Sequence, residues 1–577
     1  MSISDIVFRE DELPDRIRTH PLFPQQVILV LLAISVIVLL PILIWGFPVS
    51  SHDGETHIRW QYYYGKQLWV GDWFPRWLTD IPDGFGSPAF FIYPPFSQYV
   101  AALLAPLSDS IAWVKHRLAI ATILACFLGG GGCFLWLKQI TREYNAALIG
   151  AVVYMTAPYH LFVDTYYRAA YAELWAFAFA PATLAAIHLL TSRRRIGVAL
   201  YILGVSGLLM THAPSAVILM PLFLIYSWTL AAAQRRPSIA LWTSIATFSA
   251  VLVACAYLGT ALTQQSYIHA EGLYDGFYNF YDWLFFNPSP RPKRVFEMVG
   301  FLQAAISGLL AGSLLIVKTD RKEWLWLALG AFTGTCFLYF MMTSFSAIVW
   351  DLIPFARKIQ FPWRLQVAQT LLLALSAALF LRAVTPTLNL KLFSRDVRLS
   401  DWIGWLMVVT LIFINLAMLF LSEPKFNIAA PIRTAETPEY TLGDNISGAK
   451  YFPGEEKVFV VEGNGSVKLI RWEPRHVEFE INALTKMEML VKQFTYAGWT
   501  CRGSGDDSAC RVLSNKTGEI LHVVVSPGMQ RIRITMPETK EERFGKLASI
   551  AGLVIAVISV FAGGMRARVS NKKDKAT

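Results

Sequence analysis

The stretch Val27–Phe47 reads VILVLLAISVIVLLPILIWGF and carries no charged side chain. A helix needs about 20 predominantly apolar residues to cross the hydrocarbon core of a bilayer, so the stretch predicts a first membrane span over residues 25–47. Shortly after it comes His52-Asp-Gly-Glu-Thr-His57, where four of six side chains are ionisable. We therefore expect membrane helices that surround a cavity, with this acidic loop directed into it.

The rest of the 577-residue chain has the composition of a membrane protein. Hydrophobic residues make up 55% and charged residues only 16%, whereas soluble domains carry about 25% charged residues. The mean hydropathy is +0.43. The net charge of +10 lies largely in loops and at the chain ends, which favours a role in membrane topology over nucleic-acid binding. The predicted fold class is a polytopic α-helical membrane protein.

Further apolar runs predict eleven more spans, about twelve in all. They cover residues 117–137, 145–163, 173–191, 197–213, 215–233, 239–262, 297–317, 323–343, 364–382, 402–421 and 546–563. Residues 94–107 are apolar but too short to cross the bilayer, and we expect them to lie along the membrane surface. The transmembrane module then covers residues 25–421.

The basic loops predict the orientation, because Lys and Arg concentrate on the cytoplasmic side. They are Arg193–Arg195, Arg235-Arg236, 318–322, 382–398 and 566–575. With twelve spans these loops share one side with a cytoplasmic N-terminus, residues 1–24, and a basic tail, 564–577, so both termini are expected in the cytoplasm. Residues 1–24 are too polar for a cleavable signal peptide. The extracytoplasmic side then receives residues 48–116, 164–172, 265–296, 344–363 and 422–545.

Residues 422–545 have a different pattern, in which short segments alternate apolar and polar side chains between turn residues. The segments are 457–462, 466–472, 476–481, 487–492, 522–525 and 530–535. Such a pattern predicts a β-sandwich, here an extracytoplasmic β-domain tethered by the last span, 546–563. Cys501 and Cys510 lie in this polar region and predict a disulfide, hence an oxidising compartment.

The first loop holds the leading catalytic candidates, Asp53 and Glu55. The following stretch, Ile58 to Val70, is rich in Trp and Tyr, which favour the membrane interface. It is therefore expected to lie along the interface and hold the acidic turn at a fixed depth. The alternative is an ordinary solvated loop with an aromatic belt.

A second candidate segment runs from Asp164 to Glu173 and contains Arg168. Charged side chains so close to a bilayer need protein or water around them. The Arg168 guanidinium offers a planar fork of donors that suits phosphate. Alternatively, Arg168 and Glu173 form a structural ion pair, and both interpretations can hold together.

Three more features lie on the same predicted face. His212 precedes Pro214 in Thr211-His-Ala-Pro214, where it either serves function or satisfies a helix kink. The stretch 351–364 carries Arg357, Lys358 and Arg364 against the positive-inside trend, which either a phosphate substrate or anionic headgroups would explain. The loop 265–296 is rich in aromatic and polar residues, a composition that suits sugar binding and equally an interfacial loop. Those residues are Tyr267, His269, Glu271, Asp275, Tyr278, Tyr281, Asp282 and Trp283.

Several phrases of the sequence resemble the GT-C superfamily of multispan glycosyltransferases. The chain is similar, more narrowly, to YfhO-like and 6-pyruvoyl-tetrahydropterin-synthase-related bacterial membrane proteins. The phrases are HDGETHIRW, DGFGSPAFFIYPP, YYRAAYAELWAF, MTHAPSA, LIPFARKIQFPWR and FTYAGW, which together extend over most of the chain. The superfamily often shows two adjacent acids, whereas Gly54 separates Asp53 from Glu55 here. That departure puts a metal in doubt.

The resemblance implies transfer of a sugar, a hexosyl or pentosyl group, from a polyprenyl-phosphate donor. Asp53 matches the position of the catalytic acidic group, with Glu55 as its reserve. The substrate-binding candidates are Tyr167, Arg168, Glu173, His212, Lys358 and Arg364. The sequence identifies no definite cofactor, although Asp53 and Asp164 could hold a divalent cation such as Mg²⁺ or Mn²⁺.

These expectations describe an enzyme of the bacterial inner membrane, facing the cell envelope. Its partners are membrane lipids, the lipid-linked donor, and an envelope glycan, lipid or protein as acceptor, with no nucleic acid. The alternatives are a lipid or oligosaccharide transporter and a non-catalytic envelope scaffold. Transporters usually show repeated halves and broken helices at mid-membrane, and neither feature stands out in this sequence.

Overall fold

The computed structural model describes residues 25–573 with short internal gaps. The gaps are residues 109, 269–275, 317–321, 385–388, 393–394, 423–425, 427–435, 441, 443–450, 453–455, 497, 505–508 and 514–515. The predicted cytoplasmic N-terminus, residues 1–24, lies outside the described residues, as does the end of the predicted basic tail, 574–577. His269, Glu271 and Asp275 of the long loop lie outside them too.

The chain is a polytopic α-helical membrane protein, as predicted, and each expected span coincides with one helix or with two consecutive segments. These elements are α2 (Gln25–Val38), α3 (Leu40–Trp45), α7 (Ile111–Thr141), α8 (Tyr144–Thr156), the π-helix η4 (Tyr159–Tyr167), α9 (Tyr171–Ser192), α10 (Arg194–Leu209), α11 (Ala213–Ala233), α12 (Pro237–Val253), α13 (Cys255–Thr263), α14 (Arg294–Ile316), α15 (Lys322–Met342), α17 (Gln366–Val384), α18 (Leu399–Ser422) and α20 (Lys540–Lys573).

Within the described residues, 9 helices are long and apolar enough to cross a membrane, or up to 10 if the bent pair α12 and α13 forms one span. The predicted first and fifth spans are shorter than a full crossing. Helix α2 has 14 residues and continues after a break at Leu39 into α3, and α10 has 16 residues. These two spans were predicted from apolar composition alone, and composition does not indicate where a helix breaks or ends.

Close packing of α7 against α9 depends on glycines in the middle of α7. A Cβ at Gly132 would lie 2.7 Å from the backbone nitrogen of Ala182, and one at Gly129 would lie 2.9 Å from the carbonyl oxygen of Phe177. Small residues let membrane helices approach in this way. The two helices therefore form a firm central pair, to which the turn carrying Arg168 is attached.

The first loop folds into a compact unit of its own. It consists of α4 (Gly54–Trp69), α5 (Ala89–Ile92), α6 (Phe96–Ala102) and the 3-10 turn η3 (Ala105–Leu107). The aromatic residues of α4, expected at the membrane interface, mostly pack against protein. Trp60 and Tyr64 are 2% and 0% exposed, whereas Trp69 is 48% exposed. The reason is that the segment after α4 folds back over it and buries Trp60 and Tyr64 against Leu78, Ile81 and Phe90.

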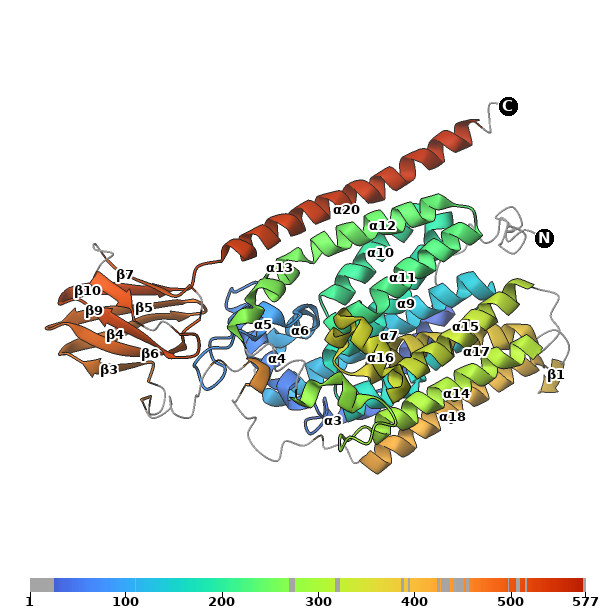
Figure 1. Cartoon of the computed structure of the whole chain (residues 1–577), viewed down its shortest axis with the longest axis horizontal. Helices are drawn as coiled ribbons and strands as arrows, with labels where there is room; N and C mark the ends of the chain where they lie inside the picture. The colour runs from blue at the N-terminus through green and yellow to red at the C-terminus, as the bar shows by residue number, and fades with distance from the viewer. Residues whose placement is uncertain are drawn as a thin grey trace.

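The C-terminal β-domain is a sandwich of two antiparallel four-stranded sheets (Figure 1). One sheet has the order β4 (Gly465–Glu473), β5 (His476–Ala483), β10 (Gly528–Thr535), β7 (Thr500–Gly503). The other has the order β3 (Val458–Glu462), β6 (Met487–Phe494), β9 (Ile520–Val525), β8 (Cys510–Val512). Six strands were predicted, and the short β7 and β8 were not. The predicted disulfide between Cys501 and Cys510 is present and joins β7 of one sheet to β8 of the other.

The β-domain shares a hydrophobic core with the first loop. Trp77, Phe85 and Phe91 of the loop are buried together with Phe494 and Tyr496 of the domain. Trp77 Nε1 donates to Gln493 Oε1 at 2.7 Å, and Gln493 Nε2 donates to the Gly84 carbonyl at 2.7 Å. Helix α20 runs from the sandwich along α13, α12 and α10 (Figure 1). The sandwich is therefore fastened both to the first loop and to the helix bundle.

Candidate active site

Four separate segments bring charged side chains together beside the N-terminus of α4. Arg168, between η4 and α9, is the centre of the cluster. Its Nη1 lies 2.6 Å from Asp164 Oδ1 and 2.6 Å from Glu173 Oε2, and its Nη2 lies 3.8 Å from Asp53 Oδ2. The Arg168–Glu173 ion pair, one of the two interpretations drawn from the sequence, is thus present. The pair is buried, so its geometry is held by protein on all sides.

Glu173 connects this pair to two further segments. Its Oε1 accepts a hydrogen bond from Tyr159 at 2.8 Å. Its Oε2 lies 3.9 Å from His212 Nε2 and 4.0 Å from Arg364 Nε. His212 precedes α11, and Arg364 belongs to the 3-10 turn η11 (Pro362–Leu365). Of the residues singled out from the sequence, Asp53, Asp164, Arg168, Glu173, His212 and Arg364 therefore meet in one place.

The backbone around Arg168 is unusual. The preceding segment is the π-helix η4, and π-helical turns occur frequently at functional sites. Ala169, the next residue, has φ of +54°, a conformation that L-residues adopt at a cost of about 1–2 kcal/mol. This turn lets the Arg168 carbonyl accept from the Asp53 backbone nitrogen at 2.8 Å. The first loop and the α9 turn are thereby locked together directly at the two charged residues.

Gly54 explains why the two acids of the first loop are separated. A Cβ at this position would lie 1.9 Å from the carbonyl oxygen of Pro48, closer than any side chain can come. Position 54 therefore accepts only glycine where the loop turns back on itself to begin α4. Asp53 stands as the N-terminal flanking residue of that helix, and Glu55 is turned towards Arg59 at 3.8 Å.

The three acids of the cluster differ sharply in exposure. The side chain of Asp53 is 45% exposed, whereas those of Asp164 and Glu173 are 0% and 1% exposed. Within this set Asp53 is the carboxylate that an incoming molecule can reach.

His57, one turn into α4, is neutral at physiological pH. Burial lowers its pKa to about 4, an effect that the nearby Asp53 carboxylate opposes and the Arg168 cation supports. The ring packs against Tyr171 and Tyr93, and Gln98 lies 3.4 Å from Nδ1. We conclude that His57 fixes the start of α4 and carries no charge into the cluster.

Arg364 is held in place by hydrogen bonds that leave its Nε–H without a hydrogen-bond acceptor among the described residues. Its Nη1 donates to the Ile359 carbonyl at 2.9 Å and to Gln360 Oε1 at 2.6 Å. Gln360 has φ of +65°, so a strained turn supports this arginine as well. Arg364 Nε is buried and makes no hydrogen bond with the part of the chain that is described. The side chain can therefore offer a donor to an anion near Glu173.

The remaining predicted residues lie at the margin of the cluster. Tyr167 packs against the His52 ring, with 4.9 Å between ring centroids. Lys358 lies exposed in η10 (Pro354–Ile359), outside the buried group. Asp53 and Asp164 both face Arg168, so a guanidinium lies against the two carboxylates expected to hold a cation. Among the residues that are described, no three His, Cys, Asp or Glu side chains form a metal-binding group. The donor set therefore does not fit a divalent cation.

Sequence reasoning missed three residues of the site. Tyr159 lies in a largely apolar run, where its aromatic ring did not distinguish it from other span residues. Trp363 packs under Arg168, with 4.5 Å from the guanidinium carbon to the ring centroid, and appeared in the sequence only as one more aromatic. Glu436 reaches the first loop from 376 residues further along the chain than Trp60, to which it is hydrogen-bonded. No local pattern announces a contact of that separation.

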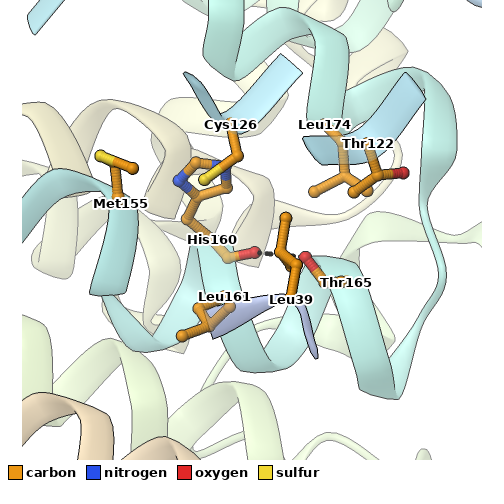
Figure 2. Close-up of a pocket in the computed structure, with 8 residues that line it drawn as sticks. All are labelled: Leu39, Thr122, Cys126, Met155, His160, Leu161, Thr165 and Leu174. Carbon is orange, nitrogen blue, oxygen red and sulfur yellow. Dashed lines mark hydrogen bonds between the residues drawn. The ribbon is translucent and has the colours of Figure 1, made fainter. Parts of the chain in front are cut away.

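A small pocket lies among the membrane helices (Figure 2). It is lined by Leu39, Thr122, Cys126, Met155, His160, Leu161, Thr165 and Leu174. His160 turns its ring towards Cys126 and Met155 in this view, and its backbone carbonyl accepts from Thr165. The space is too narrow for a water-sized sphere and none of the charged residues of the cluster lines it. We regard it as a packing gap.

The fold and the site together define a multi-pass membrane protein with a charged cluster between its first loop and its helix bundle. No protein-family model matches the sequence, and no curated protein matches it either. Among solved structures, it is similar to the arabinofuranosyltransferase AftD from Mycobacteria, at 14% identity and a TM-score of 0.39, over 70% of this chain and 28% of that one. The chain thus spans about 28% of the length of AftD.

A second similar structure is ArnT from Cupriavidus metallidurans, solved bound to undecaprenyl phosphate. It has 12% identity and a TM-score of 0.29 over 62% of this chain and 77% of that one. The same protein in the apo state has 11% identity and a TM-score of 0.29. These likenesses are too distant to assign this chain to a family.

Proposed function

We propose that the chain is a GT-C-type membrane glycosyltransferase that moves a sugar from a polyprenyl-phosphate donor to a cell-envelope acceptor. One observation carries the proposal: Asp53 is a half-exposed carboxylate beside a buried cluster of two arginines. An acceptor hydroxyl is a poor nucleophile until a positioned base removes its proton. A departing lipid phosphate needs cationic donors. The cluster offers both groups side by side.

The proposed transfer step uses only these residues. The acceptor hydroxyl gives its proton to Asp53 as its oxygen bonds to the anomeric carbon of the donor sugar. The bond from that carbon to the phosphate oxygen breaks, and the lipid phosphate leaves with the electron pair. Arg364, with an unused buried donor, stabilises the phosphate, and the exposed Lys358 attracts it. Arg168 contributes positive charge while Asp164 and Glu173 hold it in place.

The proposed setting puts the loops that meet at the cluster on one side of the membrane. We assign the first loop, the α9 turn and the β-domain to the extracytoplasmic side of a bacterial inner membrane, with both termini in the cytoplasm. Donor and acceptor would then approach Asp53 from the envelope side. The separation between a buried arginine layer and an accessible acid suits a lipid-borne donor on one side and a water-borne hydroxyl on the other.

The test is the Asp53→Asn variant, which keeps the size of the side chain and removes the base. We expect transfer of the sugar to fall at least about 100-fold. It is measured by mass spectrometry of envelope glycolipids in a deletion strain complemented with each variant. Asp351→Asn is the matched control, because Asp351 is an exposed acid paired with Arg357 and should leave transfer unchanged. Equal incorporation by the wild type and Asp53→Asn, at equal protein levels, would refute the proposed function.

A further inference from the structure

Residues Glu436–Tyr440 form a short segment, here called the strap, that enters the first loop from the region before the β-domain. It ends in the 3-10 turn η12 (Pro438–Tyr440). The side chain of Glu436 is 0% exposed, which is rare for a carboxylate without partners to compensate its charge. The strap therefore places a buried charge deep in the first loop, and the surrounding residues show what that charge does.

Glu436 is fully engaged with the first loop. Its Oε1 accepts from Trp60 Nε1 at 3.0 Å, and its Oε2 accepts from the Ser87 hydroxyl at 2.5 Å. The Arg59 guanidinium lies 3.9 Å away. Trp60 and Arg59 belong to α4, the helix that Asp53 begins, so three of the contacts of one carboxylate fix that helix and the segment covering it.

Arg59 carries the connection from Glu436 to the start of α4. It lies 3.8 Å from Glu55 Oε1 and donates to the Thr56 hydroxyl at 3.4 Å. Glu55 and Thr56 follow Asp53 by two and three residues. A path of charged contacts therefore runs from Glu436 through Arg59 to the first turn of α4, where the Asp53 carboxylate is oriented.

The other end of the strap reaches the Arg364 side of the cluster. Tyr440 packs on Trp60 and Tyr93, with centroid separations of 5.6 and 6.4 Å. Glu439 accepts a hydrogen bond from Tyr278, whose ring lies 5.7 Å from that of Phe361. Phe361 in turn packs against the Arg364 guanidinium. The strap thus contacts α4, which begins at the candidate base Asp53, and is connected through Tyr278 and Phe361 to Arg364, the candidate phosphate-binding residue.

We propose that Glu436 is a positioning residue for Asp53: it neutralises Arg59 and holds α4 so that the Asp53 carboxylate faces Arg168. This inference rests on the proposed function of Asp53 as base. Without Glu436, the Arg59 cation would lack that counter-charge near the N-terminus of α4. An additional positive charge there stabilises the ionised form of a neighbouring carboxylate.

The charged and titratable groups facing Asp53 come from several elements. They are His52, His57, Tyr93, Arg168, Tyr278 and Arg364. The strap also contacts two of them, Tyr93 through Tyr440 and Tyr278 through Glu439. A change in the pH dependence of transfer is therefore assigned to Arg59 only when the additional substitution Arg59→Met reverses it.

The experiment compares the full-length wild type with Glu436→Gln, with purified polyprenyl-phosphate sugar as donor. We expect transfer at pH 7 to fall about tenfold or more and the acid limb of the kcat/KM profile to move about 1 pH unit lower. Glu480→Gln makes the same chemical change at an exposed position of β5 and should show neither effect. An unmoved acid limb in Glu436→Gln, or the same shift in Glu480→Gln, would overturn the inference.

A double variant and hydrogen exchange test the role of Glu436 further. If Glu436→Gln does not fold, the double variant Arg59→Met/Glu436→Gln replaces it, because this variant removes both charges. We expect the double variant to fold and the acid limb of its kcat/KM profile to lie at the pH of the wild type. An acid limb that stays shifted in the double variant contradicts the inference. Hydrogen exchange of residues 54–61 gives a readout that does not depend on catalysis. If Asp53→Asn transfers as the wild type does, the proposed function fails. Unchanged exchange in Glu436→Gln would instead contradict the positioning of α4.

Discussion

At the scale of single residues, the acids of the cluster differ in burial. Asp164 and Glu173 lie inside the protein and are both hydrogen-bonded to the Arg168 guanidinium, so both side chains are committed to one cation. Asp53 lies 3.8 Å from the same guanidinium, yet remains half-exposed. Buried ion pairs are costly to break once formed, whereas exposed pairs contribute little to stability. Under the proposed function, stability and chemistry thus depend on different acids of one group.

Glu173→Gln and Asp53→Asn should separate these two roles. Glu173→Gln leaves the buried Arg168 and Arg364 without a full counter-charge, and we expect it to reduce the free energy of unfolding by about 3 kcal/mol. Asp53→Asn should change the thermal unfolding midpoint by little while abolishing transfer. The measurement is thermal unfolding in detergent, monitored alongside transfer. An equal loss of stability in both variants would show that the acids share one structural role.

At the scale of elements, α4 is the piece on which the site depends. It is fixed at its start by the Asp53 backbone bond to Arg168, in its middle by Glu436, and below by Trp60 and Tyr64 in their own core. Its first residue, Gly54, touches the Pro48 carbonyl. The helix is therefore anchored at its start, in its middle and on its core-facing side, while Asp53 at its N-terminus remains half-exposed.

Gly54→Ala tests how much the start of α4 matters. The added methyl group would overlap the Pro48 carbonyl, so the loop must shift and carry Asp53 away from Arg168. We expect at least about a 100-fold loss of transfer, since misplacement by about 1 Å costs that much. Gly71→Ala is a control for loss of a first-loop glycine, because no heavy atom lies within 4 Å of its Cβ position, although its positive φ adds some strain. Full activity of Gly54→Ala would refute the dependence on this contact.

How far the sequence predicts these elements depends on the length of each pattern. The spans and six of the strands were predictable because apolar runs and alternation persist over many residues. Strands β7 and β8 have 4 and 3 residues, too few for alternation to be distinguished from chance. The ion pair of Arg168 and Glu173 was also predictable, because both residues are conspicuous beside apolar helices; their part in substrate binding stays a prediction.

Other features could not be predicted from the sequence, for identifiable reasons. Trp and Tyr serve both membrane interfaces and protein cores, so the burial of Trp60 and Tyr64 depends on a covering segment that no local pattern specifies. The contact of Glu436 with Trp60 joins residues 376 positions apart. The strained turns at Ala169 and Gln360 occupy residue types that do not favour positive φ.

At the scale of the whole molecule, the β-domain is integral to the first loop. Gln493 alone accepts from Trp77 and donates to the Thr79 and Gly84 carbonyls. Beside it, the buried Glu542 of α20 pairs with Arg76 of the loop at 3.4 Å and with Arg475 of the sandwich at 2.9 Å. One carboxylate thereby ties together the first loop, the sandwich and the last helix.

Gln493→Leu should loosen this attachment. It keeps a comparable volume but leaves the buried groups of Trp77, Thr79 and Gly84 without partners, each at a cost of about 1–3 kcal/mol. We expect limited proteolysis to release the β-domain several-fold faster and transfer to decline with it. Gln530→Leu, at a half-buried position of β10 where the amide donates only to the Ser526 carbonyl of the adjacent turn, is the matched control. Equal cleavage of the two variants would mean that the polar contacts of Gln493 do not hold the domain in place.

The shared core of the first loop and the β-domain has a consequence for biosynthesis. Trp77 emerges from the ribosome 416 residues before Gln493, its hydrogen-bond partner. At about 5–20 residues per second, the first loop waits on the order of 20–80 s for the residues that complete its core. During that interval nearly every membrane helix is inserted while the loop still lacks the strap and the sandwich. A chain that terminates before residue 436 would therefore lack α20 and never complete the core of its first loop, even after its other helices are inserted.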